Sequence, residues 1–141
     1  MRQAVVDASI AAKWVIEEEH SAKAALLLDF DALHAPDHWL AEAINVLWAK
    51  VFREEFTNPD AEEWMTVLLR APVIGTPIAG LMPRAFAISA ARMVTIYDSL
   101  YVALAEKRDI PMVTADERLI RQLSADAGLA KRMIWVADLA V

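Results

Sequence analysis

The chain has 141 residues, of which 57% are hydrophobic and 24% are charged, and 14 basic against 20 acidic side chains give a formal net charge of −6. This length predicts a single domain, residues 1–141, that buries a hydrophobic core without help from disulfides or a structural metal. Cysteine is absent from the sequence, which excludes thiolate zinc sites and thiol nucleophiles and fits a reducing compartment. The negative charge argues against broad nucleic-acid binding through basic patches.

The N-terminal sequence predicts neither a secretory signal nor a membrane span. An apolar run begins soon after Met1 but is broken at Asp7, and the longest uncharged stretches are too short to cross a bilayer. We therefore expect a soluble, cytoplasmic protein with no membrane association.

Short apolar runs alternate with segments of helical spacing along the chain. The first run, residues 3–7, ends on an acid, and helical spacing then continues through Ile10 and Trp14. Further strands are expected at residues 32–35, 73–74, 111–114 and 133–136. Helices are expected at residues 21–28, 37–56, 79–93, 95–108 and 116–124, and one more after residue 58, with Asn58 as its N-cap and Pro59 as its first residue.

Apolar strands separated by helices predict an α/β fold with a parallel sheet covered on both faces. In such sheets the ligand site lies beyond the carboxyl ends of the strands. Asp7 closes the first predicted strand, and Asp116 follows the strand at 111–114. Two carboxylates are therefore expected at one edge of the sheet.

Two further acids can join them. Glu42 and Asn45 are three residues apart on the long predicted helix and so share a face, set against an apolar one. Asp98 stands three residues after Thr95, a candidate helix N-cap, where its carboxylate would point out of the first turn.

These residues resemble the PIN domain, and most closely the VapC-type toxins of prokaryotic toxin–antitoxin pairs. The similar fragments are VVDAS at 5–9, EAIN at 42–45, YDS at 97–99 and VTAD at 113–116. The resemblance implies a three-layer α/β/α sandwich around a mostly parallel sheet of four to five strands. It also implies an endoribonuclease that uses Mg²⁺ or Mn²⁺ to cut RNA, a homodimer, and a cognate antitoxin that blocks the active site.

Carried over residue by residue, the resemblance implies a catalytic, metal-holding quartet of Asp7, Glu42, Asp98 and Asp116. Its supporting polar positions fall on Ser9, Asn45 and Thr114, with assistance from Ser99. Oxygen ligands without Cys or His select hard cations such as Mg²⁺. Water activated by such an ion would attack the phosphate, which usually leaves a 5′-phosphate and a 3′-hydroxyl.

Other interpretations remain open at this point. A catalytically inactive PIN-like module that binds RNA or protein fits the same sequence, whereas a receiver-like or phosphatase-like site is disfavoured because position 9 is Ser. Structural roles are expected for two groups of residues, the histidines His20, His34 and His38 and the tryptophans Trp39, Trp48 and Trp64. Candidate RNA contacts are Lys13, Arg84, Arg92, Arg118 and Arg121.

Overall fold

The computed structural model describes residues 1–140 and contains a five-stranded sheet in the order β3-β2-β1-β4-β5. Every pair of neighbouring strands is parallel, so the predicted α/β class is confirmed, and the sheet is wholly rather than mostly parallel. The strands are β1 (Gln3–Val6), β2 (Ala32–Pro36), β3 (Val73–Thr76), β4 (Met112–Thr114) and β5 (Met133–Trp135).

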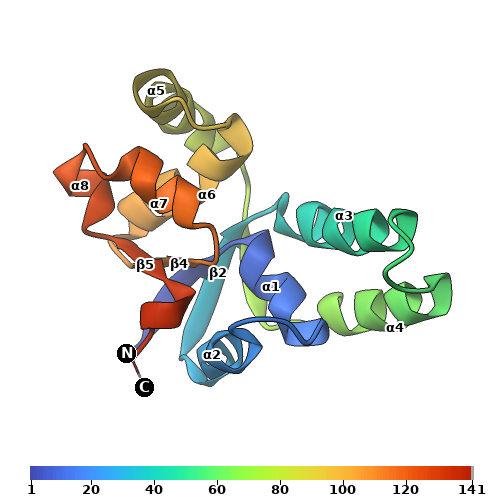
Figure 1. Cartoon of the computed structure of the whole chain (residues 1–141). Helices are drawn as coiled ribbons and strands as arrows, with labels where there is room; N and C mark the ends of the chain where they lie inside the picture. The colour runs from blue at the N-terminus through green and yellow to red at the C-terminus, as the bar shows by residue number, and fades with distance from the viewer. Residues whose placement is uncertain (141) are drawn as a thin grey trace.

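Eight α-helices connect and cover the strands within residues 1–140. They are α1 (Ala8–Val15), α2 (Ser21–Leu26), α3 (Trp39–Phe52), α4 (Asn58–Leu68), α5 (Met82–Arg92), α6 (Ile96–Arg108), α7 (Glu117–Leu123) and α8 (Ala127–Ala130). Figure 1 shows α5, α6 and α7 on one side of the sheet, α2 on the other, and the α3–α4 hairpin projecting away from it. No helix among residues 1–140 is long and apolar enough to cross a membrane.

The strands bury both of their faces, as the uninterrupted apolar runs predict. In β1, Val5 packs into the core beneath α5 and α6, while Ala4 and Val6 pack into a second core that contains residues of α2. Alternate side chains of a strand point to opposite faces, so two cores on one strand require a layer of helices on each side. This arrangement is the expected three-layer α/β/α sandwich.

The parallel register brings the ends of β1 and β4 together. Val6 pairs with Val113, so the next residues in each chain segment, Asp7 and Thr114, lie side by side at the carboxyl edge. Side chains alternate between the two faces of a strand, so Asp7 lies on the same face as Val5, and Thr114 on the same face as Met112. This is the face of the sheet that α6 covers. The topology therefore points two polar side chains toward α6.

The structure corrects several expected element boundaries. The helix expected over residues 37–56 spans only Trp39–Phe52, because Arg53 is its C-cap and Glu54 adopts a left-handed φ of 61°. Thr57, not Asn58, caps α4, and it exchanges hydrogen bonds with Asp60 in a capping box. The strand at 73–74 continues to Thr76, since Gly75 and Thr76 pair with β2.

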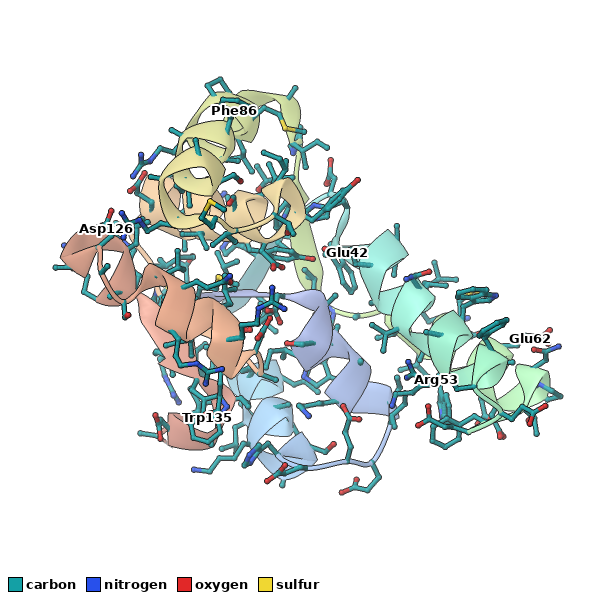
Figure 2. The ribbon with its side chains drawn as sticks, turned by 45° about the horizontal axis from the view of Figure 1, so that its top comes forward. Glu42, Arg53, Glu62, Phe86, Asp126 and Trp135 are labelled. Carbon is teal, nitrogen blue, oxygen red and sulfur yellow. The ribbon has the colours of Figure 1, made fainter. Side chains whose placement is uncertain are left out.

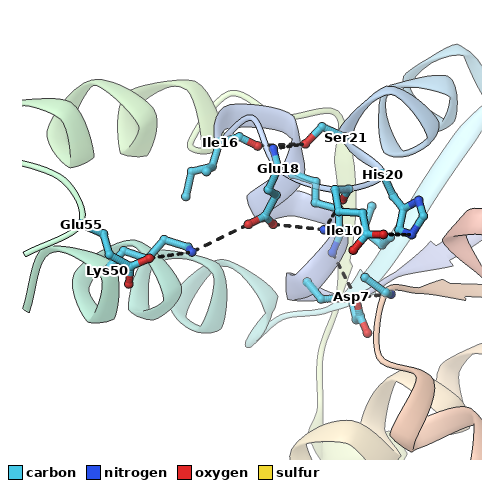
Figure 3. A network of polar contacts seen from close by, with 12 residues as sticks. Asp7, Ile10, Ile16, Glu18, His20, Ser21, Lys50 and Glu55 are labelled. Atoms are coloured by element: carbon cyan, nitrogen blue, oxygen red, sulfur yellow. Dashed lines mark hydrogen bonds and ion pairs between the residues drawn. The ribbon is translucent and has the colours of Figure 1, made fainter. Parts of the chain in front are cut away.

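Polar contacts join the loop after α1 to the hairpin. Glu18 lies 3.2 Å from Lys13 Nζ and 3.8 Å from Lys50 Nζ, and Lys50 lies 3.8 Å from Glu55 (Figure 3). From the sequence, the acids at 17–19 and 54–55 are expected to be solvated helix ends without a function. Glu18 and Glu55 instead belong to this network, although partly exposed ion pairs of this kind each contribute only about 0–1 kcal/mol.

Candidate active site

Asp7 is the most buried of the four predicted acids. It is the N-cap of α1 and is 6% exposed, and its Oδ1 accepts hydrogen bonds from Ser9 Oγ at 2.5 Å and from the backbone N–H of Ile10 at 3.3 Å (Figure 3). Its Oδ2 accepts one from Thr114 Oγ1 at 2.5 Å. Burial raises the pKa of Asp7 to about 6, even though the hydrogen bonds from Ser9 and Thr114 lower it.

Ser9 and Thr114 connect Asp7 to Asp116. Thr114 Oγ1 accepts from the backbone N–H of Asp116 at 3.0 Å, and Ser9 Oγ accepts from that of Ala115 at 3.1 Å. Asp116 is the N-cap of α7, and its Oδ1 accepts from the N–H groups of residues 118 and 119. Backbone and side-chain bonds thus fix the relative positions of two carboxylates that are far apart in the sequence.

Asp98 lies in the first turn of α6, as the sequence predicts. The Thr95 side chain caps the helix by accepting from the backbone N–H of Asp98 at 3.1 Å. Burial raises the pKa of Asp98, and the negative charges of Glu42 and Asp116 raise it further. Asp98 in turn contributes to the raised pKa of Asp7. The four acids therefore interact electrostatically at one edge of the sheet.

Glu42 comes to this edge from a different part of the molecule. It lies near the start of α3, on the part of the hairpin next to the body (Figure 2). Its Oε1 accepts a hydrogen bond from the Tyr101 hydroxyl at 2.8 Å and lies 2.9 Å from His38 Nε2. Burial would raise the pKa of Glu42, but the hydrogen bonds of His38 and Tyr101 outweigh it and lower this pKa.

The supporting residues have different surroundings. Asn45 and Glu42 line an open cavity of about 510 Å³ whose wall also includes Ala8 of α1. Ser99 is fully buried and shares a 2.8 Å hydrogen bond with Ser89 of α5, so its hydroxyl joins two packed helices. The structure thus brings Ser9, Asn45 and Thr114 next to the acids and directs Ser99 to the α5–α6 contact.

The donor set fits a hard divalent cation by its chemistry. Every predicted ligand is a carboxylate oxygen, and the mutual repulsion that raises the pKa of Asp98 is what a bound cation would relieve. Within residues 1–140, however, no three acidic or histidine side chains stand close enough together to form a ready-made metal site.

Two residues of this site, His38 and Tyr101, were not predicted from the sequence. A purely structural role is expected for His38 from the sequence, but its Nε2 contacts Glu42. Two spacings could have revealed them, because His38 precedes Glu42 by four residues and Tyr101 follows Asp98 by three, which places each pair on one helix face. The other histidines lie elsewhere, with His34 bonded to Gln3 and His20 packed edge-on against Trp135.

The sequence and the fold were compared with known proteins. The family model of the PIN domain matches residues 4–124. Ribonuclease VapC12 of Mycobacterium tuberculosis is 30% identical over 82% of this chain and 88% of its own length. Ribonuclease VapC3 of Pyrobaculum aerophilum is 33% identical over 86% of this chain and 95% of its own length.

Two crystal structures share the fold. PAE2754 from Pyrobaculum aerophilum superposes with a TM-score of 0.69 at 21% identity, covering 96% of this chain and 92% of that one. Mycobacterium tuberculosis VapC20, described as a sarcin-ricin loop cleaving toxin, superposes with a TM-score of 0.63 at 17% identity, covering 87% and 95%. The resemblance seen in the four sequence fragments is confirmed. This chain belongs to the PIN domain family, in which the relatives named here are VapC ribonucleases.

Proposed function

We propose that this protein is a Mg²⁺-dependent endoribonuclease, with Mn²⁺ as an alternative metal, and that it is the toxin of a toxin–antitoxin pair. Membership of the PIN family and the VapC ribonuclease relatives support the enzyme class. The observation that carries the metal site is geometric. Thr114 links Asp7 to the backbone of Asp116, and the hydrogen bond from Tyr101 brings Glu42 to the helix that carries Asp98. The whole of residues 1–141 would serve as one PIN-like catalytic domain.

In this mechanism Asp7, Glu42, Asp98 and Asp116 are the catalytic residues that would hold the metal. A bound divalent ion supplies an activated water and neutralises charge that develops on the phosphate. Ser9 and Thr114 orient Asp7 by donating to both of its oxygens. A pKa of about 6 leaves Asp7 largely ionised at neutral pH, as a metal ligand must be.

One basic side chain near the acids, that of Arg118, supports an RNA substrate. Arg118 follows Asp116 on α7 and is exposed, which makes it the best placed of the predicted RNA contacts. Arg84 instead forms an ion pair with Glu106 at 2.7 Å, and Lys13 pairs with Glu18. We extend the proposal to a cognate antitoxin, a homodimer and a cytoplasmic location without membrane contact, by analogy with the VapC relatives.

Cleavage of total RNA by the purified protein tests this proposal. The protein, freed of any antitoxin, is incubated with Mg²⁺, with Mn²⁺ or with EDTA, and the RNA ends are mapped by ligation-dependent sequencing. We expect discrete cuts with 5′-phosphate and 3′-hydroxyl ends that EDTA abolishes. Cuts that persist in EDTA, or that carry cyclic phosphates, would contradict the metal mechanism. RNA binding without any cleavage would instead favour the inactive binding module.

A further inference from the structure

The hydroxyl of Tyr101 lies in the core and donates a hydrogen bond to Glu42. Tyr101 is 1% exposed and lies on α6 between Leu100 and Val102, which are also buried. A hydroxyl buried in this way needs a hydrogen-bond partner inside the protein. Its only acceptor within residues 1–140 is Glu42 Oε1, at 2.8 Å.

His38 supplies a second contact to the same oxygen. Its Nε2 lies 2.9 Å from Glu42 Oε1 and 3.1 Å from the backbone carbonyl of Tyr97, while its ring packs 4.9 Å from that of Tyr101. Nδ1 is buried and has no partner within residues 1–140. A proton on Nδ1 would therefore be an unsatisfied buried donor, so a proton on Nε2 fits the surroundings best. In that form Nε2–H hydrogen-bonds the carbonyl of Tyr97 and also faces Oε1 of Glu42 at 2.9 Å.

Both contacts use Oε1, which leaves Oε2 of Glu42 without a protein donor in residues 1–140. Tyr101 follows Asp98 by three residues on α6, so the two side chains lie one turn apart on the same face of that helix. The hydrogen bond therefore draws Glu42 from the hairpin toward the sheet edge. Groups that bond one oxygen of a carboxylate orient the other for a metal.

We propose that Tyr101 and His38 are positioning residues that hold Oε1 of Glu42 and so present Oε2 to the divalent cation. This inference rests on the proposed function, because it assigns both side chains a role toward that cation. Asp7 and Asp116 are fixed by helix caps on the sheet body, whereas Glu42 reaches them from α3 and depends on these two contacts.

Substitution Tyr101→Phe tests the role of the hydroxyl while keeping the aromatic ring. The readout is the dissociation constant for Mn²⁺ without RNA, measured by the electron paramagnetic resonance signal of free Mn²⁺. We expect affinity to fall about tenfold, the usual cost of removing a group that orients a metal ligand. The matched control is Tyr97→Phe, because Tyr97 is 63% exposed and the substitution keeps both the carbonyl and the aromatic ring that contact His38. The control should bind Mn²⁺ as the wild type does.

Substitutions at His38 provide an independent test that leaves the Tyr101 hydroxyl in place. His38→Ala should weaken Mn²⁺ binding, and His38→Gln should restore most of it, because the glutamine amide can donate to the same oxygen. Tyr101→Phe should cause no further loss in a Glu42→Gln background, since the two groups act as one unit. A purely structural role for Tyr101 would instead lower the melting temperature of Tyr101→Phe and leave its Mn²⁺ affinity equal to that of the wild type.

Two results would overturn the inference. Unchanged Mn²⁺ affinity in Tyr101→Phe and His38→Ala would show that neither contact matters to the metal. Tighter binding in either variant would show that the contacts hold Glu42 away from it. If the wild type binds Mn²⁺ and cleaves RNA, these results refute only the positioning role. If the wild type does neither, the proposed function fails, and this inference fails with it.

Discussion

The carboxyl edge of the sheet buries polar side chains, whereas the α3–α4 hairpin exposes apolar ones. At the edge, Asp7 and Thr114 are almost wholly buried and bonded to each other. On the hairpin, Trp48 and Phe52 are 59% and 74% exposed and stack on each other at 5.4 Å. A folded chain normally does the reverse in both places, because a buried carboxylate and an exposed aromatic pair each cost free energy.

The difference separates a rigid part of the candidate site from an adjustable part. Asp7, Asp98 and Asp116 each stand at or near the start of a helix that packs on the sheet, so the backbone fixes them. Glu42 is the one acid of the quartet that belongs to the hairpin, and side-chain contacts alone fix it. The pKa shifts differ between the two parts. The pKa is raised for Asp7 and Asp98 in the rigid part and lowered for Glu42 on the hairpin.

Substitution Asp98→Asn is expected to have the largest effect. It removes a proposed metal ligand from the rigid part, so RNA cleavage should fall by about 100-fold or more. The apo protein should be no less stable, because the raised pKa of Asp98 means that its charge opposes folding. Cleavage assays and thermal melts check both statements. Asp29→Asn, which neutralises an exposed acid before β2, is the control and should behave as the wild type. Equal RNA cleavage by the two variants would contradict the assignment of Asp98 as a metal ligand.

The stability of the metal-free protein should depend on pH through Asp7. Its folded pKa of about 6 lies above the ordinary value of 3.8, so the folded state binds the proton more tightly than the unfolded state. This stabilisation is fully present below about pH 4 and is lost as pH rises through about 6, by up to about 3 kcal/mol. Urea unfolding in EDTA from pH 4 to pH 7.5 measures it.

Asp7→Asn provides the control for that titration, because it removes the group and should flatten the profile over this window. Mg²⁺ should act in the opposite direction and raise the melting temperature at neutral pH, since it binds the ionised folded site. A wild-type profile that matches that of Asp7→Asn would contradict the raised pKa. An unchanged melting temperature at millimolar Mg²⁺ would contradict the metal site.

Substitution Thr114→Val should destabilise the protein by about 1–3 kcal/mol, although valine has nearly the same shape. Asp7 loses a buried donor, and the backbone N–H of Asp116 loses its acceptor. The same change on the hairpin, Thr66→Val, removes only an exposed hydroxyl bonded within α4 and should cost far less. Denaturant midpoints of the two variants compare the regions directly, and equal midpoints would show that the buried bonds at the edge add nothing.

Substitution Trp48→Ser should have the smallest effect on the isolated chain. The indole is more than half exposed, so folding stability should change by less than about 0.5 kcal/mol, and cleavage should be unaffected. Leu47→Ala, one residue earlier on the same helix, removes a side chain that is 2% exposed and should cost about 2–5 kcal/mol. Comparable losses from the two would mean that the exposed face of the hairpin contributes to its folding.

Features that follow local rules could be predicted from the amino-acid sequence alone. Apolar runs and helical spacing located all five strands, and Thr95 predicted where α6 begins and hence where Asp98 lies. Parallel strands end at one edge, so the order of strands and helices along the chain was enough to place Asp7 and Asp116 at the same edge of the sheet. The predicted end of α3 was wrong because Glu54 adopts a left-handed backbone conformation, which is uncommon for glutamate and cannot be predicted from its residue type.

The meeting of distant side chains, by contrast, depends on the tertiary structure. Thr114 reaches Asp7 across 107 residues because β4 lies next to β1 in the sheet order, and Tyr101 reaches Glu42 across 59 residues because α6 lies beside the start of α3. Ser99 joins Ser89 because α5 packs on α6. Helix periodicity and capping depend on residues that are neighbours in the chain, so the sequence reveals them directly. These hydrogen bonds depend on how whole helices and strands pack against one another, and no local sequence pattern specifies that packing.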